Sequence, residues 1–173
     1  MIRKARIQDL DAIEQAYDEH FQYESEHTAY TVFKKGVYPT REGAQKAIEA
    51  GTMYVYEDGG ELCGSVIIDD AVPEEYANVP WNVDCTDKEV LIMHLLMVRP
   101  SKSGRGIATA IIEYAADFAR EQGCKALRLD TGGQNIPAVH LYEKNGFEIV
   151  LRAPKKVGGL IAHNDHLYLE RKL

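Results

Sequence analysis

The stretch from Leu91 to Thr109, LIMHLLMVRPSKSGRGIAT, constrains the fold of this chain more than any other. The apolar run that ends at Val98 predicts a buried strand, and Gly104 and Gly106 then open a segment whose apolar residues recur at helical spacing. The first N–H groups of a helix have no partner within it and lie at the positive end of its dipole, so this loop is a potential anion site. Glycine at the two positions lets a phosphate approach the backbone.

Basic residues surround the glycine loop. Arg99, Lys102 and Arg105 lie in or beside it, and no acidic residue occurs between Arg99 and Ile112. A solvated loop would explain these charges, but positive charge beside a helix N-terminus favours an anionic ligand. The whole chain carries a net charge of −7, which argues against a general nucleic-acid-binding protein because such proteins need a basic face for phosphates.

Length and composition indicate one globular domain over residues 1–173. Hydrophobic residues make up 45% and charged residues 27% of the chain, which is ordinary for a soluble protein. The longest apolar stretch, Val90 to Val98, is interrupted by His94 and is too short to cross a membrane. The N-terminus shows no signal peptide, and the three cysteines have no metal-ligand spacing. We therefore expect a cytoplasmic protein with no membrane segment and no metal site.

The hydrophobic pattern predicts a mixed sheet flanked by helices, an α/β (α+β) architecture. The predicted strands are Ile2–Ile7, Met53–Glu57, Glu61–Asp69, Val90–Val98, Ala126–Asp130, Phe147–Leu151 and His166–Leu169. The predicted helices begin at Leu10, Pro39, Ile107 and Ile136. Asp58-Gly59-Gly60 is a strong hairpin signal, and a loop rich in lysine and glycine is expected from Ala153 to Asn164.

The glycine loop allows other interpretations, which fit less well. A Walker A phosphate loop requires a lysine followed by serine or threonine after its last glycine, and no such pair follows a glycine here. A dinucleotide-binding unit would use Asp130 as its ribose-binding acid. However, its third glycine position is Thr109, and five residues separate Val98 from Gly104 where the turn is normally tight.

Two motifs resemble those of the GNAT superfamily of N-acetyltransferases. Ser103–Ala108, read as SGRGIA, resembles the Gln/Arg-x-x-Gly-x-Gly/Ala loop that binds acyl-CoA. Asn135–Phe147 resembles the second signature, N-x-x-A-x-x-L-Y-x-x-x-G-F. The resemblance implies the GNAT fold, with a mixed central sheet of about six to seven strands, splayed between the fourth and fifth, and about four helices. Ser103 departs from the usual Gln or Arg, which weakens one side-chain contact and leaves the backbone contacts intact.

The resemblance also implies that acetyl-CoA is the acyl donor. Its pantetheine arm would pair with the backbone of the central strand, and its pyrophosphate would bind the N–H groups after Ser103. The residues implied in this binding are Leu96, Met97, Val98, Ser103, Gly104, Arg105, Gly106, Ile107, Ala108, Thr109, Asn135 and Tyr142. Helix capping is an equally good interpretation of Asn135.

Two side chains are candidates for the chemistry. Tyr142 matches the tyrosine that protonates the departing thiolate in the family, although it could merely pack the helix. His94 is the candidate base that would deprotonate the amine, and Glu89 and Asp130 are the alternatives. His94 could also be a histidine that only packs or hydrogen-bonds within the core. Strand alternation would place His94 on one face with Ile92 and Leu96.

The sequence thus predicts transfer of an acetyl group from acetyl-CoA to a primary amine of a small molecule or peptide, by direct attack within a ternary complex. A catalytically inactive GNAT-fold module that binds acyl-CoA is the alternative. Seven acidic residues between Asp69 and Glu89, against Lys88 alone, would favour a cationic amine if they border the acceptor site, but a solvated acidic loop explains them equally well. Aromatic residues gather from Phe21 to Tyr38, where family members often shape the acceptor pocket, although aromatic residues also fill cores. A homodimer is the default expectation for the assembly.

Overall fold

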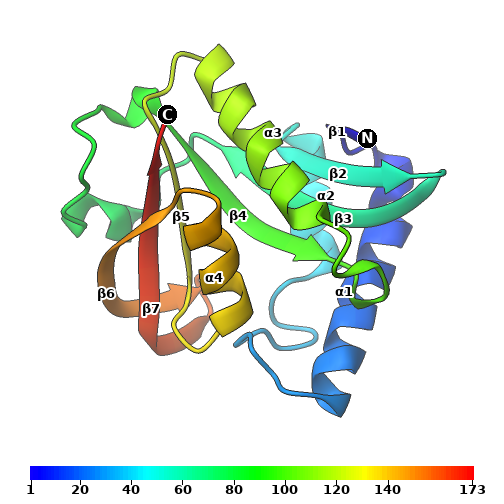
Figure 1. Ribbon diagram of the computed structural model, residues 1–173. Helices are drawn as coiled ribbons and strands as arrows, with labels where there is room; N and C mark the ends of the chain where they lie inside the picture. Colours follow the sequence, from blue (N-terminus) through cyan, green and yellow to red (C-terminus); the bar gives the residue numbers. More distant parts are fainter.

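A computed structural model describes all residues, 1–173, and is built on a seven-stranded sheet of order β1-β2-β3-β4-β5-β7-β6 (Figure 1). The strands are β1 (Ile2–Lys4), β2 (Met53–Asp58), β3 (Glu61–Asp69), β4 (Val90–Val98), β5 (Ala126–Gly132), β6 (Glu148–Val157) and β7 (Ile161–Lys172). The helices are α1 (Leu10–Glu26), α2 (Arg41–Glu49), α3 (Ile107–Glu121) and α4 (Ile136–Lys144). Only β4 and β5 pair in parallel, so the predicted mixed sheet with four flanking helices is confirmed.

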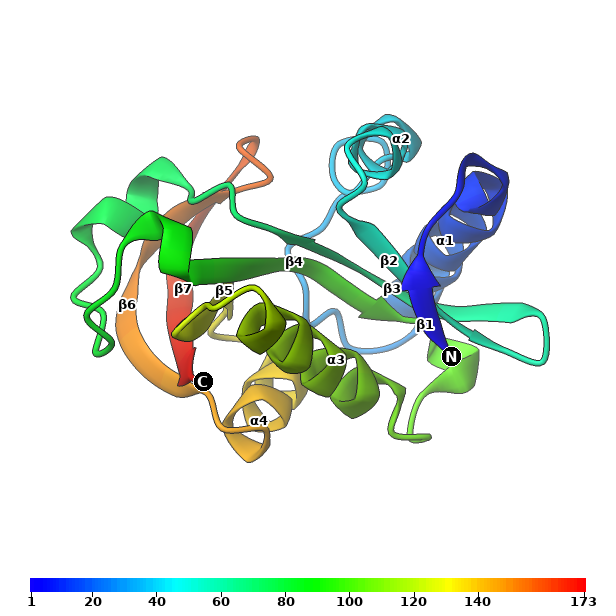
Figure 2. The same ribbon diagram turned by 90° about the horizontal axis from the view of Figure 1, so that it is seen from above.

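The helices cover the two faces of the sheet in pairs (Figure 2). α3 and α4 bury their apolar sides against one face, where Ile111 and Ala115 of α3 pack with Leu127 of β5 in the larger core cluster. α1 and α2 cover the other face, where Ile13 and Met53 belong to a separate cluster. Burial of these faces, rather than helix propensity, provides most of the stability of such elements. None of the helices combines the length and apolar character that crossing a membrane requires.

The parallel pairing of β4 and β5 is short. It covers Val90–Ile92 of β4 and Ala126–Arg128 of β5 and then stops, although both strands continue. The edge of β4 that faces β5 therefore has no strand partner beyond Ile92. This is the predicted splay between the fourth and fifth strands. It leaves backbone groups of β4 available to a ligand that can pair like an added strand.

A β-bulge in β4 changes which of its side chains share a face. Leu95 adopts a left-handed backbone conformation, with φ of 49°, and β4 here carries one residue more than β3. After the bulge, Leu96 packs into the cluster under α3, whereas Ile92 belongs to a cluster on the opposite face. The expectation that Ile92, His94 and Leu96 share a face is therefore wrong, because one extra residue reverses the alternation.

The prediction of a loop from Ala153 to Asn164 is also wrong. β6 continues to Val157 and β7 begins at Ile161, so that only Gly158–Leu160 form the turn between them. β6 is the edge strand of the sheet and much of it is exposed to solvent, which is why polar and charged residues are tolerated along it. The added strand length carries Lys155 and His163 into the sheet, opposite each other.

Gly64 allows β3, β4 and α3 to meet closely. A Cβ atom added there would lie 2.9 Å from the Met97 carbonyl oxygen and 3.3 Å from Ile111 Cδ1. We predict that Gly64→Ala lowers the free energy of unfolding by about 1–3 kcal/mol, because the backbone oxygen cannot move aside without shifting β4. Urea denaturation measures the effect. A variant as stable as the wild type would contradict this packing.

Candidate active site

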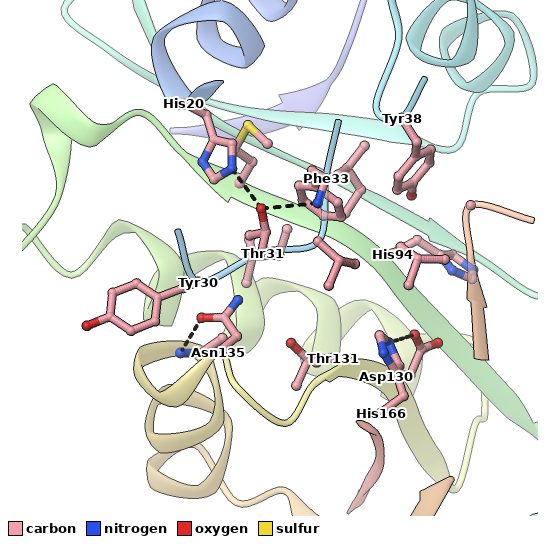
Figure 3. A pocket seen from close by; sticks show the side chains of 18 of the residues that line it. His20, Tyr30, Thr31, Phe33, Tyr38, His94, Asp130, Thr131, Asn135 and His166 are labelled. Carbon is pink, nitrogen blue, oxygen red and sulfur yellow. Dashed lines mark hydrogen bonds and ion pairs between the residues drawn. The ribbon is translucent and has the colours of Figure 1, made fainter. Parts of the chain in front are cut away.

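A cavity of about 650 Å³ lies where β4 and β5 part (Figure 3). Its walls come from β4, β5, the N-terminal end of α4, the segment between α1 and α2, and the β6–β7 hairpin. Predicted site residues that line the cavity are His94, Leu96, Met97, Val98, Ser103, Asn135 and Tyr142. Residues far apart in the sequence are thus brought to one site. Asn135 also caps α4, since its side chain accepts a hydrogen bond from the N–H of Ala138 at 3.3 Å.

The loop from Gly104 to Thr109 does not line the cavity but continues from Ser103 at its wall. Gly104 and Gly106 both have φ of 74°, a conformation that glycine adopts readily. No N–H group from Gly104 to Thr109 donates a hydrogen bond within the protein; the first that does is that of Ala110, to the Gly106 carbonyl. This row of free donors at the start of α3 fits a pyrophosphate. Ile107 contributes only backbone, because its side chain is buried in the core.

The basic side chains around this loop are not free. Each is paired with an acidic residue from α1 or from the β2–β3 hairpin, which the local sequence does not reveal. The pairs are Arg99 with Glu19, Lys102 with Glu61 and Arg105 with Asp58, at N···O distances of 2.6, 2.6 and 3.2 Å. The basic side chains are thus partly neutralised by acidic partners that lie outside the loop sequence. The capacity of the loop to bind an anion rests mainly on its backbone N–H groups.

Tyr142 projects from α4 to the wall of the cavity and is 8% exposed. Its ring packs edge-on against Phe147, with 5.7 Å between the ring centroids. Its hydroxyl makes no hydrogen bond within the protein and is not sealed from solvent. Burial, and to a smaller extent the nearby carboxylate of Asp130, raises the pKa of Tyr142 above its ordinary value. The hydroxyl therefore keeps its proton at neutral pH and is free to donate it.

His94 reaches the cavity from the other side of the splay. Its Nε2 lies 3.1 Å from Oδ1 of Asp69, and its side chain is 25% exposed. Because a carboxylate only accepts hydrogen bonds, the neutral ring carries its proton on Nε2 and leaves Nδ1 as an acceptor. Glu89, the alternative base, lies elsewhere: it caps the turn before β4 and pairs with Lys125 at 2.7 Å.

Asp130, the other alternative base, is at the centre of a buried polar cluster that the sequence did not reveal. Its carboxylate accepts hydrogen bonds from Tyr76 at 2.7 Å, His166 at 2.8 Å and Lys155 at 2.9 Å. The ring of His166 also contacts that of His163, with 3.1 Å between their Nδ1 atoms. Burial acts to raise the pKa of Asp130, but the hydrogen bonds and charges of His166 and Lys155 outweigh it and hold the pKa well below its usual range.

Asp130 is thus an ionised carboxylate with both oxygens hydrogen-bonded, which suits a structural anion better than a base. The neighbouring acidic run does not surround the cavity either. Of the acids from Asp69 to Glu89, Glu75 is the one that lines it, and Lys155 and Lys156 line it as well. The composition of that run therefore gives no support for a cationic acceptor.

Comparison with known proteins agrees with this geometry. Residues 10–147 match the Acetyltransferase (GNAT) family. The chain belongs to the GNAT family. Its sequence is 31% identical over 127 residues to an uncharacterised N-acetyltransferase of Methanocaldococcus jannaschii, covering 69% of this chain and 52% of that protein. It is 37% identical over 67 residues to the streptothricin acetyltransferase of Streptomyces lavendulae, covering 39% and 32% of the two chains. The chain thus spans about half or less of the length of these relatives.

Solved structures of the family share the fold. A GNAT-family acetyltransferase from Streptococcus agalactiae superposes with a TM-score of 0.79 at 20% identity, covering 100% of this chain and 95% of that one. A protein from Salmonella typhimurium, solved with its cofactor acetyl-CoA, gives a TM-score of 0.70 at 20% identity, covering 100% and 93%. GNAT proteins use acetyl-CoA, and the free N–H groups and the unpaired edge of β4 described above fit that group.

Proposed function

We propose that this chain is a single-domain GNAT N-acetyltransferase, over residues 1–173, that transfers an acetyl group from acetyl-CoA to a primary amine by direct attack. The observation that carries the proposal is the splay itself: the β4–β5 pairing stops at Ile92, and the gap opens into the cavity that both Tyr142 and His94 line. A site for the acyl donor and two groups able to move protons therefore share one space.

Binding of the donor would use the backbone on both sides of Ser103. The free N–H groups from Gly104 to Thr109 would hold the pyrophosphate, and the unpaired edge of β4 from Leu96 to Val98 would hold the pantetheine arm. A backbone N–H at that edge can polarise the thioester carbonyl. Asn135 would act beside the arm while it caps α4. When bound, acetyl-CoA supplies the activated acyl group and a thiol leaving group.

The two side chains would then move the protons. An alkyl amine is mostly protonated at neutral pH and must lose a proton before its nitrogen can form the new C–N bond. His94 would accept that proton on Nδ1, directly or through water, while Asp69 holds the ring. Tyr142 would donate its hydroxyl proton to the sulfur as the C–S bond breaks, and the second proton that the nitrogen loses on becoming an amide would reprotonate the tyrosine. The products are the acetylated amine and free CoA.

Calorimetric titration with acetyl-CoA, together with a thiol-release assay over a panel of amines, tests the proposal. We expect acetyl-CoA to bind and thiol release to depend on an added amine. Tight binding without release from any amine would instead identify the chain as an inactive acyl-CoA-binding module, and absence of binding would contradict both functions.

The role of His94 predicts a pH-dependent defect. His94→Ala should lower kcat/KM about 100-fold at neutral pH and progressively less as the pH rises, because the free amine then becomes abundant without a base. The rate–pH profile of wild type and variant measures this. His140→Ala, on the outer side of α4 and outside the cavity, is the matched control. A loss of equal size at every pH would show that His94 only packs the strand.

A further inference from the structure

The end of the cavity beside His94 is walled by a contact between two distant segments. The ring of Tyr38, which precedes α2, occupies the space beside Gly158 in the β6–β7 turn; a Cβ atom added to Gly158 would lie 2.5 Å from that ring. Both residues line the cavity. Figure 3 shows Tyr38 and His94 on one side of the cavity and Tyr30 and Asn135 on the other. The contact therefore lies on the side where the acceptor amine has to meet His94.

Tyr38 is held in place by its own segment. Its backbone forms a two-way bridge with Lys34, with both N···O distances at 3.0 Å. Its ring packs edge-on against Phe33, with 5.4 Å between centroids. The side chain is partly buried, and this burial raises the pKa of Tyr38 to about 12. The Tyr38 ring is thus a fixed part of the wall.

The other end of the segment is tied to α1. One carboxylate, that of Glu24, accepts hydrogen bonds from the N–H groups of Tyr30 and Thr31 at 2.8 and 2.9 Å and from the Thr31 hydroxyl at 2.7 Å. The segment between α1 and α2 is therefore held at Glu24 near one end and contacts Gly158 at the other, and residues between these points line the cavity.

The volume of this cavity is small for two substrates. A cavity of about 650 Å³ is of the size that holds one drug-sized ligand, and here it has to hold the acyl arm of the donor together with the acceptor. A small amine can end inside this space. A peptide or a protein lysine has to continue beyond its amine, and the contact between Tyr38 and Gly158 lies on the side where that amine meets His94.

We propose that the contact between Tyr38 and Gly158 restricts the acceptor to small primary amines and excludes peptide N-termini and protein lysines. This inference rests on the proposed acetyl transfer and selects one of the acceptor classes that the function leaves open. It makes Tyr38 a residue that determines specificity by limiting size, with no part in the chemical step.

Thiol release measured with benzylamine, with spermidine and with a short peptide that has an N-terminal alanine tests the size limit. Wild type should use at least one of the small amines and should use the peptide at least tenfold less efficiently, measured as kcat/KM. Equal use of the peptide would overturn the size limit while leaving the proposed function intact. Release with no acceptor would contradict the proposed function, and the size limit with it.

Substitutions at Tyr38 and Gly158 provide a second test of the size limit. Tyr38→Ala should raise kcat/KM for the peptide relative to the small amine about tenfold, and Gly158→Ala should act in the same direction because its Cβ displaces the ring. Tyr38→Phe keeps the ring and should keep the wild-type ratio. Val37→Ala, next to Tyr38 but exposed and outside the cavity, is the matched control. An unchanged ratio in a folded Tyr38→Ala protein, checked by thermal denaturation, would overturn the proposal.

Discussion

Replacing Tyr142 with phenylalanine is expected to lower kcat about 100-fold or more while leaving the affinity for acetyl-CoA nearly unchanged. Phenylalanine keeps the ring that packs against Phe147, so the wall of the cavity stays in place. What it removes is a hydroxyl that is used by no other group of the protein. The loss should therefore appear in the step in which the thiolate departs and not in binding.

Steady-state kinetics and calorimetry on the same preparations separate these effects. Tyr114→Phe is the matched control, because Tyr114 also lies on a helix and packs among aromatic rings but does not line the cavity. Because burial raises the pKa of Tyr142, wild-type kcat should show no loss from ionisation of this tyrosine as the pH approaches 10. Unchanged kcat in Tyr142→Phe would exclude the tyrosine as the acid.

Asp130→Asn is expected to have the largest effect on stability, a loss of about 3–5 kcal/mol in the free energy of unfolding at neutral pH. The substitution keeps the size of the side chain and removes the charge that compensates Lys155, whose side chain is only 10% exposed. It also replaces an acceptor of three hydrogen bonds with an amide, one end of which can only donate. The cluster would then contain a buried cation whose one remaining anionic partner is Glu75, at the longer distance of 3.9 Å.

The pH dependence of that loss follows from the lowered pKa of Asp130. A carboxyl whose pKa is lower in the folded than in the unfolded protein stabilises the fold above the unfolded value, about 3.9, and this stabilisation is lost as the pH falls toward the folded value. The difference between wild type and variant should thus be constant from pH 7 to about 5 and shrink at lower pH.

Urea denaturation at a series of pH values measures this difference. Asp117→Asn, at an exposed position on α3, is the control and should change stability by about 0.5 kcal/mol or less. If Asp130→Asn costs under about 1 kcal/mol at pH 7, the cluster does not stabilise the sheet as described.

Much of the fold could be predicted because its central elements have strong patterns. The expected strand Val90–Val98 appears with those boundaries because it is a continuous apolar run, and the helices begin at Ile107 and Ile136 as expected because each combines an apolar period with a glycine, proline or asparagine at its start. The second helix begins at Arg41, after its cap Thr40, rather than at Pro39. The glycine loop precedes α3 and Tyr142 lies on α4, as the predicted elements have them.

The remaining errors come from interactions between distant residues. Lys155 and His166 contribute to the Asp130 cluster, but Lys155 lies where the charged, glycine-containing sequence of an edge strand resembles a loop. The pair Gly158-Gly159, read as a hairpin turn between alternating polar and apolar residues, is the signal from which the longer strands β6 and β7 could have been predicted. The bulge at Leu95 has no sequence signal. Leucine does not favour positive φ, so this backbone conformation is imposed by the surrounding sheet.

A crystal structure of the protein with acetyl-CoA would locate the donor directly. We expect the pyrophosphate on the backbone N–H groups between Gly104 and Thr109, the pantetheine arm along β4 beyond Ile92, and the thioester sulfur within hydrogen-bonding distance of the Tyr142 hydroxyl. Acetyl-CoA bound elsewhere, with β4 and β5 parted and Tyr142 making no contact to it, would contradict the assignment of this cavity as the active site.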